Sequence, residues 1–441
     1  MHKSYPVIHP FTWMPPSGTL TTDTWLEQVT CLERGDGSWV YDTQGKAYLY
    51  TTTAVPTVGL SNWRVIQAMK EQMERLSFAS TCAQTHGLVE PLADKLLRLC
   101  GSRYAKVFFT NDGSGAVETA MRLIRQHFIS RGEAKRDKFI SFDGNFHGTT
   151  YGSGSVTHLG IREMFGRGLD DCLCAPAPNL YRPPGALSSP ESAADFCLKE
   201  LERLIGEAGP ETIAAVLVEP IQAVNGVVLM PETFFSQIRT LTRQYGIAVI
   251  SDEVTTGLGR TGHWSLSEKY GLEPDVLAVS KGLTGGYFPM GAVLMSSELD
   301  DSLFGSGGIL LHGSTQCGHP VGCAAALEVL EIIEQDGLPD HAAVRGQGLL
   351  DDFADALAGH PNVGDIRGMG LMLALEFVKD KATKEPVDFE WGRRLSGHLH
   401  DEGILGNYFN GILLMYPPLN VSGEECDFLV HGVTRALRRM G

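Results

Sequence analysis

The sequence predicts an α/β fold, with a large domain built on a mainly parallel central sheet and a smaller α+β domain. Apolar runs of strand length alternate with longer segments of helical period through the middle of the chain. This alternation is typical of a parallel sheet that is covered by helices on both faces. After about residue 323 the order of elements changes, which indicates the second domain. The 441 residues, 43% of them hydrophobic, are enough for a large core.

The elements of the large domain follow in order along the chain. Six strands are expected, at AKVFFT (105–110), KFISF (138–142), AAVLVEP (214–220), IAVISDE (247–253), DVLAVS (275–280) and GAVLM (291–295). The helices expected between them include AVETAMRLIRQHF (116–128) and PETFFSQIRTLTRQYG (231–246).

The two ends of the chain are expected to pack together. Near the N-terminus, SWVYDTQGKAYLY (38–50) predicts a hairpin with Gly45 at the turn. The C-terminal part is expected to hold helices and strands at VGCAAALEVLEIIEQ (321–335), HAAVRGQGLLDDFADALAG (341–359), GLMLALEFV (370–378) and GILLMYPPL (411–419). The expected organisation is an N-terminal segment over 1–60 that packs with the small domain, a large domain over 61–323 and a small domain over 324–441.

Composition narrows the classes of function. A formal charge of −16 and a pI near 5.3 argue against nucleic acid as a partner. The nine cysteines show no C-x-x-C spacing, so we expect a reduced, cytoplasmic setting and no metal site. The N-terminus lacks the pattern of a secretion signal, and no run of about 18 apolar residues predicts a membrane span.

A lysine stands where an apolar strand meets a glycine-rich turn. Lys281 follows DVLAVS and precedes GLTGG. A lysine at a strand end often extends its amine to water, and for a lysine taken at random that is the commoner situation. However, ligands of open α/β sheets bind outside the carboxyl ends of the strands, and a lysine buried there has a lowered pKa that suits a nucleophilic amine.

Other strand ends carry polar or glycine-rich groups. After the first strand, NDGSG places Gly113 and Ser114 at a helix N-terminus, which suits an anion. Asp252 ends a strand and requires a positive partner if it is buried. Phe146 and Glu219 follow two further strands. Taken alone, the NDGSG segment is more typical of a capped loop than of an anion site, and Phe146 is more typical of core packing than of a stacking surface.

A glycine pattern at residues 257, 259 and 262 matches a dinucleotide fingerprint, but acids precede it and no helix begins at its end, so we do not expect that site.

Together, the strand-end groups match the requirements of pyridoxal 5'-phosphate. The helix N–H groups suit its phosphate, and Phe146 suits stacking on its ring. Asp252 suits its pyridine nitrogen, and the amine of Lys281 suits its aldehyde. Glu219 is expected to line the same site.

At these residues the sequence resembles the class III aminotransferases, pyridoxal-phosphate enzymes of fold type I. The resemblance extends from HPFT (9–12) to PPL (417–419) and is most specific in DEVTTGLGRTG (252–262), VSKGLTGGYFPMGAV (279–293) and GHPVGCAAAL (318–327). It implies a homodimer with active sites at the subunit interface. The resemblance implies that Lys281 forms the Schiff base with the cofactor and that Asp252 contacts its pyridine nitrogen. It implies that Val254 and Phe146 lie on the two faces of the ring. It also implies that Gly113 and Ser114 bind the phosphate, and that Thr315 reaches the phosphate in the neighbouring subunit.

Four positions depart from the family pattern. Phe146 replaces a common tyrosine, Gly115 a glutamate and Thr255 a glutamine. An ungapped alignment puts Asn407 where amine-accepting members carry a mobile arginine, and no arginine lies between residues 394 and 435. The usual clamp for a substrate carboxylate is therefore expected to be absent, unless Arg182 supplies it.

The expected activity is a ping-pong transamination from a small-molecule amino donor to an aldehyde or ketone acceptor, with Lys281 shuttling the proton. An amine or amino-sugar type acceptor is favoured, because the arginine is missing and the chain is acidic. The alternative on the same cofactor is an epimerase or aminomutase, which needs a second acid such as Cys317 or Tyr416. A non-catalytic regulator would require a fused DNA-binding segment, for which the sequence gives no sign.

Overall fold

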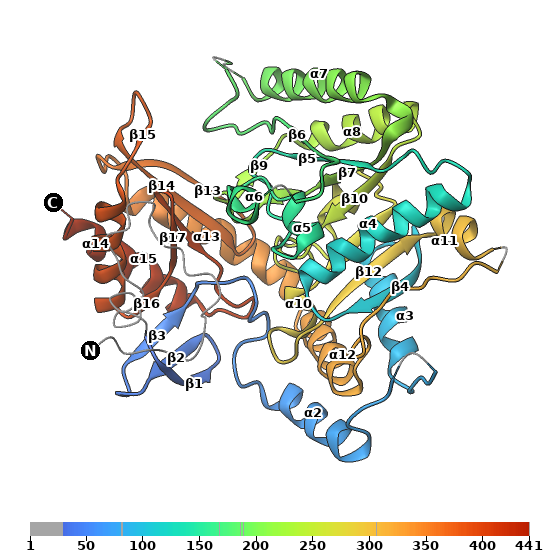
Figure 1. Ribbon diagram of the computed structural model, residues 1–441. Helices are drawn as coiled ribbons and strands as arrows, with labels where there is room; N and C mark the ends of the chain where they lie inside the picture. The colour runs from blue at the N-terminus through green and yellow to red at the C-terminus, as the bar shows by residue number, and fades with distance from the viewer. Residues whose placement is uncertain are drawn as a thin grey trace, which may run out of the picture.

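The computed structural model describes residues 30–80, 83–166, 168–185, 187, 189–305 and 307–440. The start of the family resemblance at residues 9–12, and the first half of the expected N-terminal segment, lie outside these residues. Figure 1 shows a large part around a central sheet and a smaller part that contains the C-terminal helices.

A seven-stranded sheet in the order β4-β12-β11-β10-β7-β5-β6 forms the centre of the large part of the described chain. All six predicted strands are present, β6 is added at one edge, and only β12 runs antiparallel to its neighbours, so the predicted mainly parallel sheet is confirmed. The strands are β4 (Tyr104–Thr110), β5 (Lys138–Phe142), β6 (Cys172–Ala175), β7 (Ile213–Val218), β10 (Ala248–Asp252), β11 (Val276–Val279) and β12 (Gly291–Ser296). A short ribbon of β8 (Ile221–Gln222) and β9 (Val228–Leu229) follows β7.

Helices cover both faces of this sheet because successive strand side chains alternate between faces. In β10, Ala248 and Ile250 pack in the same core cluster as α4 (Gly113–Ser130), whereas Val249 packs with α8 (Glu232–Gln244). The other helices of the large part are α2 (Trp63–Arg75), α3 (Val89–Cys100), α5 (Tyr151–Ser155), α6 (Ile161–Phe165), α7 (Pro190–Ala208), a 3-10 turn (Pro210–Thr212), α9 (Leu266–Lys269), α10 (Lys281–Thr284), α11 (Ser297–Phe304) and α12 (Pro320–Gln335).

The smaller part joins both ends of the described chain. The predicted hairpin forms, with Gly45 at its turn, and β3 pairs with β16 near the C-terminus. The helix α12 runs through residue 323, so the proposed domain boundary falls inside a helix. The strands are β1 (Leu32–Asp36), β2 (Trp39–Asp42), β3 (Ala47–Tyr50), β13 (Val363–Met369), β14 (Met372–Asp380), β15 (Glu385–Pro386), β16 (Ile404–Leu405), β17 (Asn407–Phe409) and β18 (Ile412–Met415), and the helices are α13 (Leu338–Ala356), α14 (Phe389–Asp401) and α15 (Gly423–Arg438).

Hydrogen bonds of Arg260 connect the large part and the smaller part of the molecule. Its guanidinium is fully buried and donates from Nη1 to the carbonyl oxygens of Leu371, at 3.1 Å, and Pro417. Burial lowers the pKa of Arg260 to about 9. The backbone N–H of Leu371 donates in return to the carbonyl of Arg260. The loop after β10 is therefore held against the turn between β13 and β14.

None of the described helices combines the length and the apolar character that crossing a bilayer requires. The described residues also contain no group of three or more His, Cys, Asp or Glu side chains arranged to hold a metal ion.

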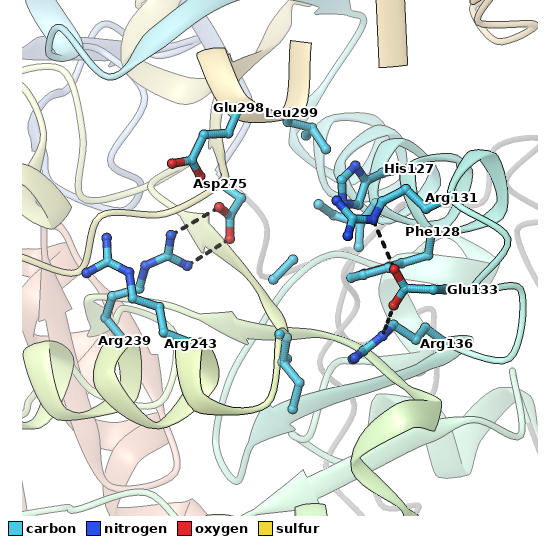
Figure 2. Close-up of a pocket in the computed structure, with 14 residues that line it drawn as sticks. His127, Phe128, Arg131, Glu133, Arg136, Arg239, Arg243, Asp275, Glu298 and Leu299 are labelled. Atoms are coloured by element: carbon cyan, nitrogen blue, oxygen red, sulfur yellow. Dashed lines mark hydrogen bonds and ion pairs between the residues drawn. The ribbon is translucent and has the colours of Figure 1, made fainter. Parts of the chain in front are cut away.

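A cavity of about 540 Å³ lies where β10 and β11 begin, at the opposite edge of the sheet from the predicted site (Figure 2). Its charged side chains form ion pairs with one another or with residues beside the cavity. Arg239 donates to both oxygens of Asp275 at 2.9 and 3.1 Å, and Glu133 accepts from Arg131 and Arg136. Because these acids and arginines satisfy each other, the cavity is explained as a structural ion-pair network.

Breaking this network at its buried pair should destabilise the protein. Asp275→Ala leaves the Arg239 guanidinium buried without its partner and removes the acceptor of the Val249 N–H, 2.8 Å away. We expect the free energy of unfolding to fall by about 3–5 kcal/mol, measured by urea unfolding with saturating cofactor. The control Glu207→Ala removes an exposed partner of Arg203 and should cost about 0.5 kcal/mol or less. Equal losses in the two variants would contradict this account.

Candidate active site

The carboxyl ends of β10 and β11 bring the two most informative polar residues together. These strands are parallel neighbours, with Asp252 opposite Ala278 in the register. Asp252 is the last residue of β10, and Lys281 follows β11 by two residues, at the start of α10. Both side chains therefore lie at the edge of the sheet where ligands of α/β folds bind.

Asp252 is 5% exposed, and both of its carboxylate oxygens accept hydrogen bonds. Its Oδ2 lies 2.8 Å from Nδ1 of His147, and its Oδ1 accepts from the backbone N–H of Val254 at 3.0 Å. Its direct partners among the described residues are a histidine ring and a backbone amide, and this pattern suits an ionised carboxylate. The positive partner expected from the sequence, the pyridine nitrogen of the cofactor, stays a prediction.

The adjacent acid, Glu253, serves the fold. Because neighbouring residues of a strand face opposite sides, Glu253 points away from the Asp252 side of the sheet. Its oxygens accept from the Ser265 hydroxyl and from the N–H groups of Leu266 and Ser267, each at 2.8 Å. It thereby satisfies the free donors at the start of α9.

The amine of Lys281 contacts Thr255, one of the four residues that depart from the family pattern. Its Nζ donates to Oγ1 of Thr255 at 2.6 Å. Burial lowers the pKa of Lys281, and the charge of Arg260 acts in the same direction, while Asp252 and Glu219 oppose it. The amine is therefore more often uncharged at neutral pH than a surface lysine, and an uncharged amine is the nucleophilic form.

The N-terminus of α4 offers the anion cradle that the sequence predicted. Asp112 caps the helix by accepting from the Gly115 N–H at 2.7 Å. No acceptor for the N–H groups of Gly113 and Ser114 lies among the described residues, so both remain available. A Cβ at Gly113 would lie 2.8 Å from Cγ1 of Val254, so only glycine fits this position.

Glu219 lies beside the same group of residues. It is 4% exposed and accepts from the N–H groups of Phe146, at 2.6 Å, and Ala223. Burial raises the pKa of Glu219 to about 7, with the charge of Asp252 adding to the shift. Phe146 is thus held between the His147–Asp252 pair and Glu219.

Two predicted residues lie apart from the buried group. Thr315 is exposed, in a loop tied to the end of β4 by a bond of 2.6 Å from Asn111 to Ser314. Arg182 donates from Nε to Glu376 at 2.6 Å, which engages one edge of its guanidinium.

The candidate second acids are poorly suited to move a proton. Tyr416 is buried and donates its hydroxyl to the carbonyl of Ala223 at 2.8 Å. Burial raises the pKa of Tyr416 well above the ordinary value for tyrosine. Cys317 lies in a loop, 3.6 Å from the Ser314 hydroxyl.

Comparison with known proteins gives a family match over almost the whole chain. The family described as aminotransferase class-III matches residues 22–437. This chain belongs to the class III aminotransferases. Their cofactor is pyridoxal 5'-phosphate, so the predicted family, fold type, enzyme class and cofactor are confirmed.

This class III aminotransferase is similar to characterised relatives over nearly its full length. It is 33% identical to the adenosylmethionine-8-amino-7-oxononanoate aminotransferase of Geobacter sulfurreducens, covering 98% of this chain and 95% of the relative. It is 34% identical to the vanillin aminotransferase of Capsicum chinense, over 92% and 91% of the two chains. Among solved structures, an amine transaminase from an uncultivated Pseudomonas species is 32% identical with a TM-score of 0.92, over 98% of this chain and 100% of that one. The omega transaminase of Pseudomonas jessenii with PMP is 36% identical with a TM-score of 0.91, over 98% and 96%.

The residues present fit pyridoxal 5'-phosphate. The free N–H groups at Gly113 and Ser114 suit a phosphate, and the Gly113–Val254 contact leaves the approach to the helix open only because residue 113 has no side chain. Gly148, at φ +126, likewise permits a close approach, since a Cβ there would lie 2.4 Å from Oγ of Ser114. Buried Asp252 and the amine of Lys281 complete a set with one anion, one amine and one anion-binding helix end.

Sequence reasoning missed the residues behind Asp252. His147, Asn145 and Gln222 were not predicted as site residues. The available signal was a histidine in the loop that follows the carboxyl end of β5, because that end lies at the same edge of the sheet as the end of β10.

Proposed function

We propose that Lys281 is the covalent attachment point of the cofactor and the group that moves the substrate proton. When bound, pyridoxal 5'-phosphate supplies an aldehyde for the donor amine and an electron sink for the bond that breaks at the substrate carbon. The observation that carries this assignment is the Lys281 amine, which lies at the carboxyl edge of the sheet, partly buried, bonded to Thr255 and with its pKa lowered. Its Nζ takes the proton from the substrate carbon and returns one to the cofactor carbon.

We propose that the remaining site residues orient the cofactor and stabilise its charges. We assign Asp252 to the pyridine nitrogen, where its carboxylate holds a proton in place. The free N–H groups of Gly113 and Ser114 bind the phosphate, and the α4 dipole adds to that attraction. Val254 and Phe146 flank the ring.

A homodimer completes the site in this proposal. Thr315 lies in a loop in which Ile309 and Leu311 are 72% and 81% exposed. Large apolar side chains so exposed indicate a surface that another chain covers. Ser314, next to Thr315, is bonded to Asn111 close to the anion cradle, which supports assigning Thr315 to the phosphate in a second copy of this chain.

For the acceptor we propose an aldehyde or ketone of amine or amino-sugar type that carries no carboxylate. Asn407 begins β17, beside β18, whose C-terminal neighbour Tyr416 contacts Ala223 next to Glu219. The strand that carries the arginine in amine-accepting relatives thus reaches this site but presents an amide. Arg182 is engaged by Glu376. The names of the relatives include vanillin, an aldehyde without a carboxylate.

The direct experiment is a screen of donors and acceptors that follows each half-reaction by the absorbance of the bound cofactor. Amino-sugar and simple aldehyde acceptors should regenerate the starting form faster than pyruvate. Ketone release from the donor separates transamination from epimerisation, which releases none. Equal efficiency for pyruvate and every uncharged acceptor would refute the substrate proposal and leave the transaminase assignment intact.

Installing the missing guanidinium should shift preference toward carboxylates. A carboxylate that enters an apolar pocket unpaired loses several kcal/mol of hydration, which a guanidinium fork compensates. Asn407→Arg should therefore lower KM for pyruvate about tenfold and raise it for a cationic acceptor. Asn407→Gln, which lengthens the side chain without charge, should leave both KM values close to wild type. If the arginine variant behaves like the glutamine variant, residue 407 does not contact the substrate.

A further inference from the structure

A chain of buried side-chain hydrogen bonds leads to Asp252 from the loop after β7. Asn225 Nδ2 donates to Gln222 Oε1 at 2.9 Å, and Gln222 Nε2 donates to Asn145 Oδ1 at 2.7 Å. Asn145 Nδ2 lies 3.1 Å from Nε2 of His147, whose Nδ1 is bonded to Asp252. Gln222 and Asn145 are completely buried, so water does not compete for these groups.

One backbone carbonyl determines which group donates and which accepts in each of these side-chain hydrogen bonds. Gln222 Nε2 also lies 2.7 Å from the carbonyl oxygen of Asp143, which only accepts, so the orientation of the Gln222 amide is fixed. Asn145 must then accept with Oδ1 and donate with Nδ2. Nε2 of His147 receives that bond and carries no proton. The ring proton is therefore on Nδ1 and is donated to Asp252.

We propose that Asn145, oriented by Gln222, is a positioning residue that holds His147 in its neutral Nδ1–H form. Asp252 then keeps its full negative charge. If Asn145 presented its oxygen instead, His147 would carry a proton on both nitrogens and its positive charge would offset that of the carboxylate. The tautomer stands on the hydrogen bonds alone, and its effect on turnover rests on the proposed role of Asp252.

The loop geometry maintains this arrangement. Gly144 has φ +81, and a Cβ there would lie 2.0 Å from Nδ2 of Asn225. Glycine at this position therefore lets Asn225 close against Gln222. The backbone N–H of His147 donates to Thr157 Oγ1 at 2.9 Å, which anchors the main chain that carries the ring.

The test reads the two ring nitrogens of His147 directly. In holoenzyme labelled with ¹⁵N-histidine, the His147 signals are identified by their loss in His147→Gln. We expect one protonated and one bare nitrogen in the wild type at neutral pH. Asn145→Asp presents only acceptors to Nε2 and should give two protonated nitrogens. It should also lower kcat about tenfold, since a positively charged His147 ring would then offset the charge of Asp252 at the cofactor. Gln222→Met removes the group that orients Asn145 and should move the signals in the same direction.

Two variants serve as controls. Asn225→Ala removes only the first donor of the chain and should leave the His147 signals unchanged, because Asp143 still fixes Gln222. Gln244→Met makes the same substitution at an exposed position. Two protonated nitrogens in the wild type, or unchanged signals in both Asn145→Asp and Gln222→Met, would overturn the proposal. A changed tautomer with unchanged kcat would instead remove the assigned role of Asp252.

Discussion

Lys281→Ala should lose turnover by more than about a thousandfold, because the variant lacks both the attachment point and the proton carrier. Borohydride treatment of the wild-type holoenzyme, followed by peptide mass spectrometry, should find the cofactor on the peptide that contains Lys281. The same treatment of the variant should find it on no lysine.

The Lys281→Ala variant should stay folded. Burial lowers the pKa of Lys281, so the folded chain holds this proton less tightly than the unfolded chain does. At pH values below the unfolded pKa the lysine therefore costs stability, and removing it is not expected to lower Tm. Lys269→Ala, at a partly exposed lysine on α9, is the matched control and should keep its turnover. Covalent cofactor at another lysine, or retained turnover, would exclude the assignment.

Asp252→Asn should lower kcat by about 10²–10³-fold while cofactor binding persists, because the shape remains and the negative charge is lost. An asparagine also supplies one acceptor where the carboxylate supplies two. Either the His147 ring or the Val254 N–H then loses its partner, at a cost of about 1–3 kcal/mol in the free energy of unfolding. Steady-state kinetics, cofactor titration and urea unfolding measure the three effects.

The control for Asp252→Asn is the same change at the exposed Asp143, which should leave kcat unaltered. If Asp252→Asn keeps near-normal turnover, another acid faces the cofactor. Glu219 is the buried acid closest in character, and its pKa of about 7 would then give kcat a dependence on pH near neutrality.

The central sheet was predictable because its strands are buried on both faces. Such strands are continuous apolar runs, and each of the six runs identified in the sequence forms a strand. The edge strand β6, CLCA, was missed because it has four residues and only the two at its ends are buried. The antiparallel direction of β12 was also beyond reach, since direction depends on how a strand is connected and paired, not on its composition.

In the site, the sequence by itself determined which residues we propose to carry the chemistry. Lys281, Asp252 and Gly113 are each marked by their place at a strand end, and the topology of a parallel sheet brings such ends to one edge. The tertiary structure alone decided what surrounds them. The partner of Asp252 is His147 from another strand end, the protonation of that ring is set through Asn145 and Gln222, and the neighbouring acid Glu253 turns away to cap a helix. Hydrogen bonds between residues as far as 105 positions apart depend on how the loops pack, and no local pattern of residues encodes them.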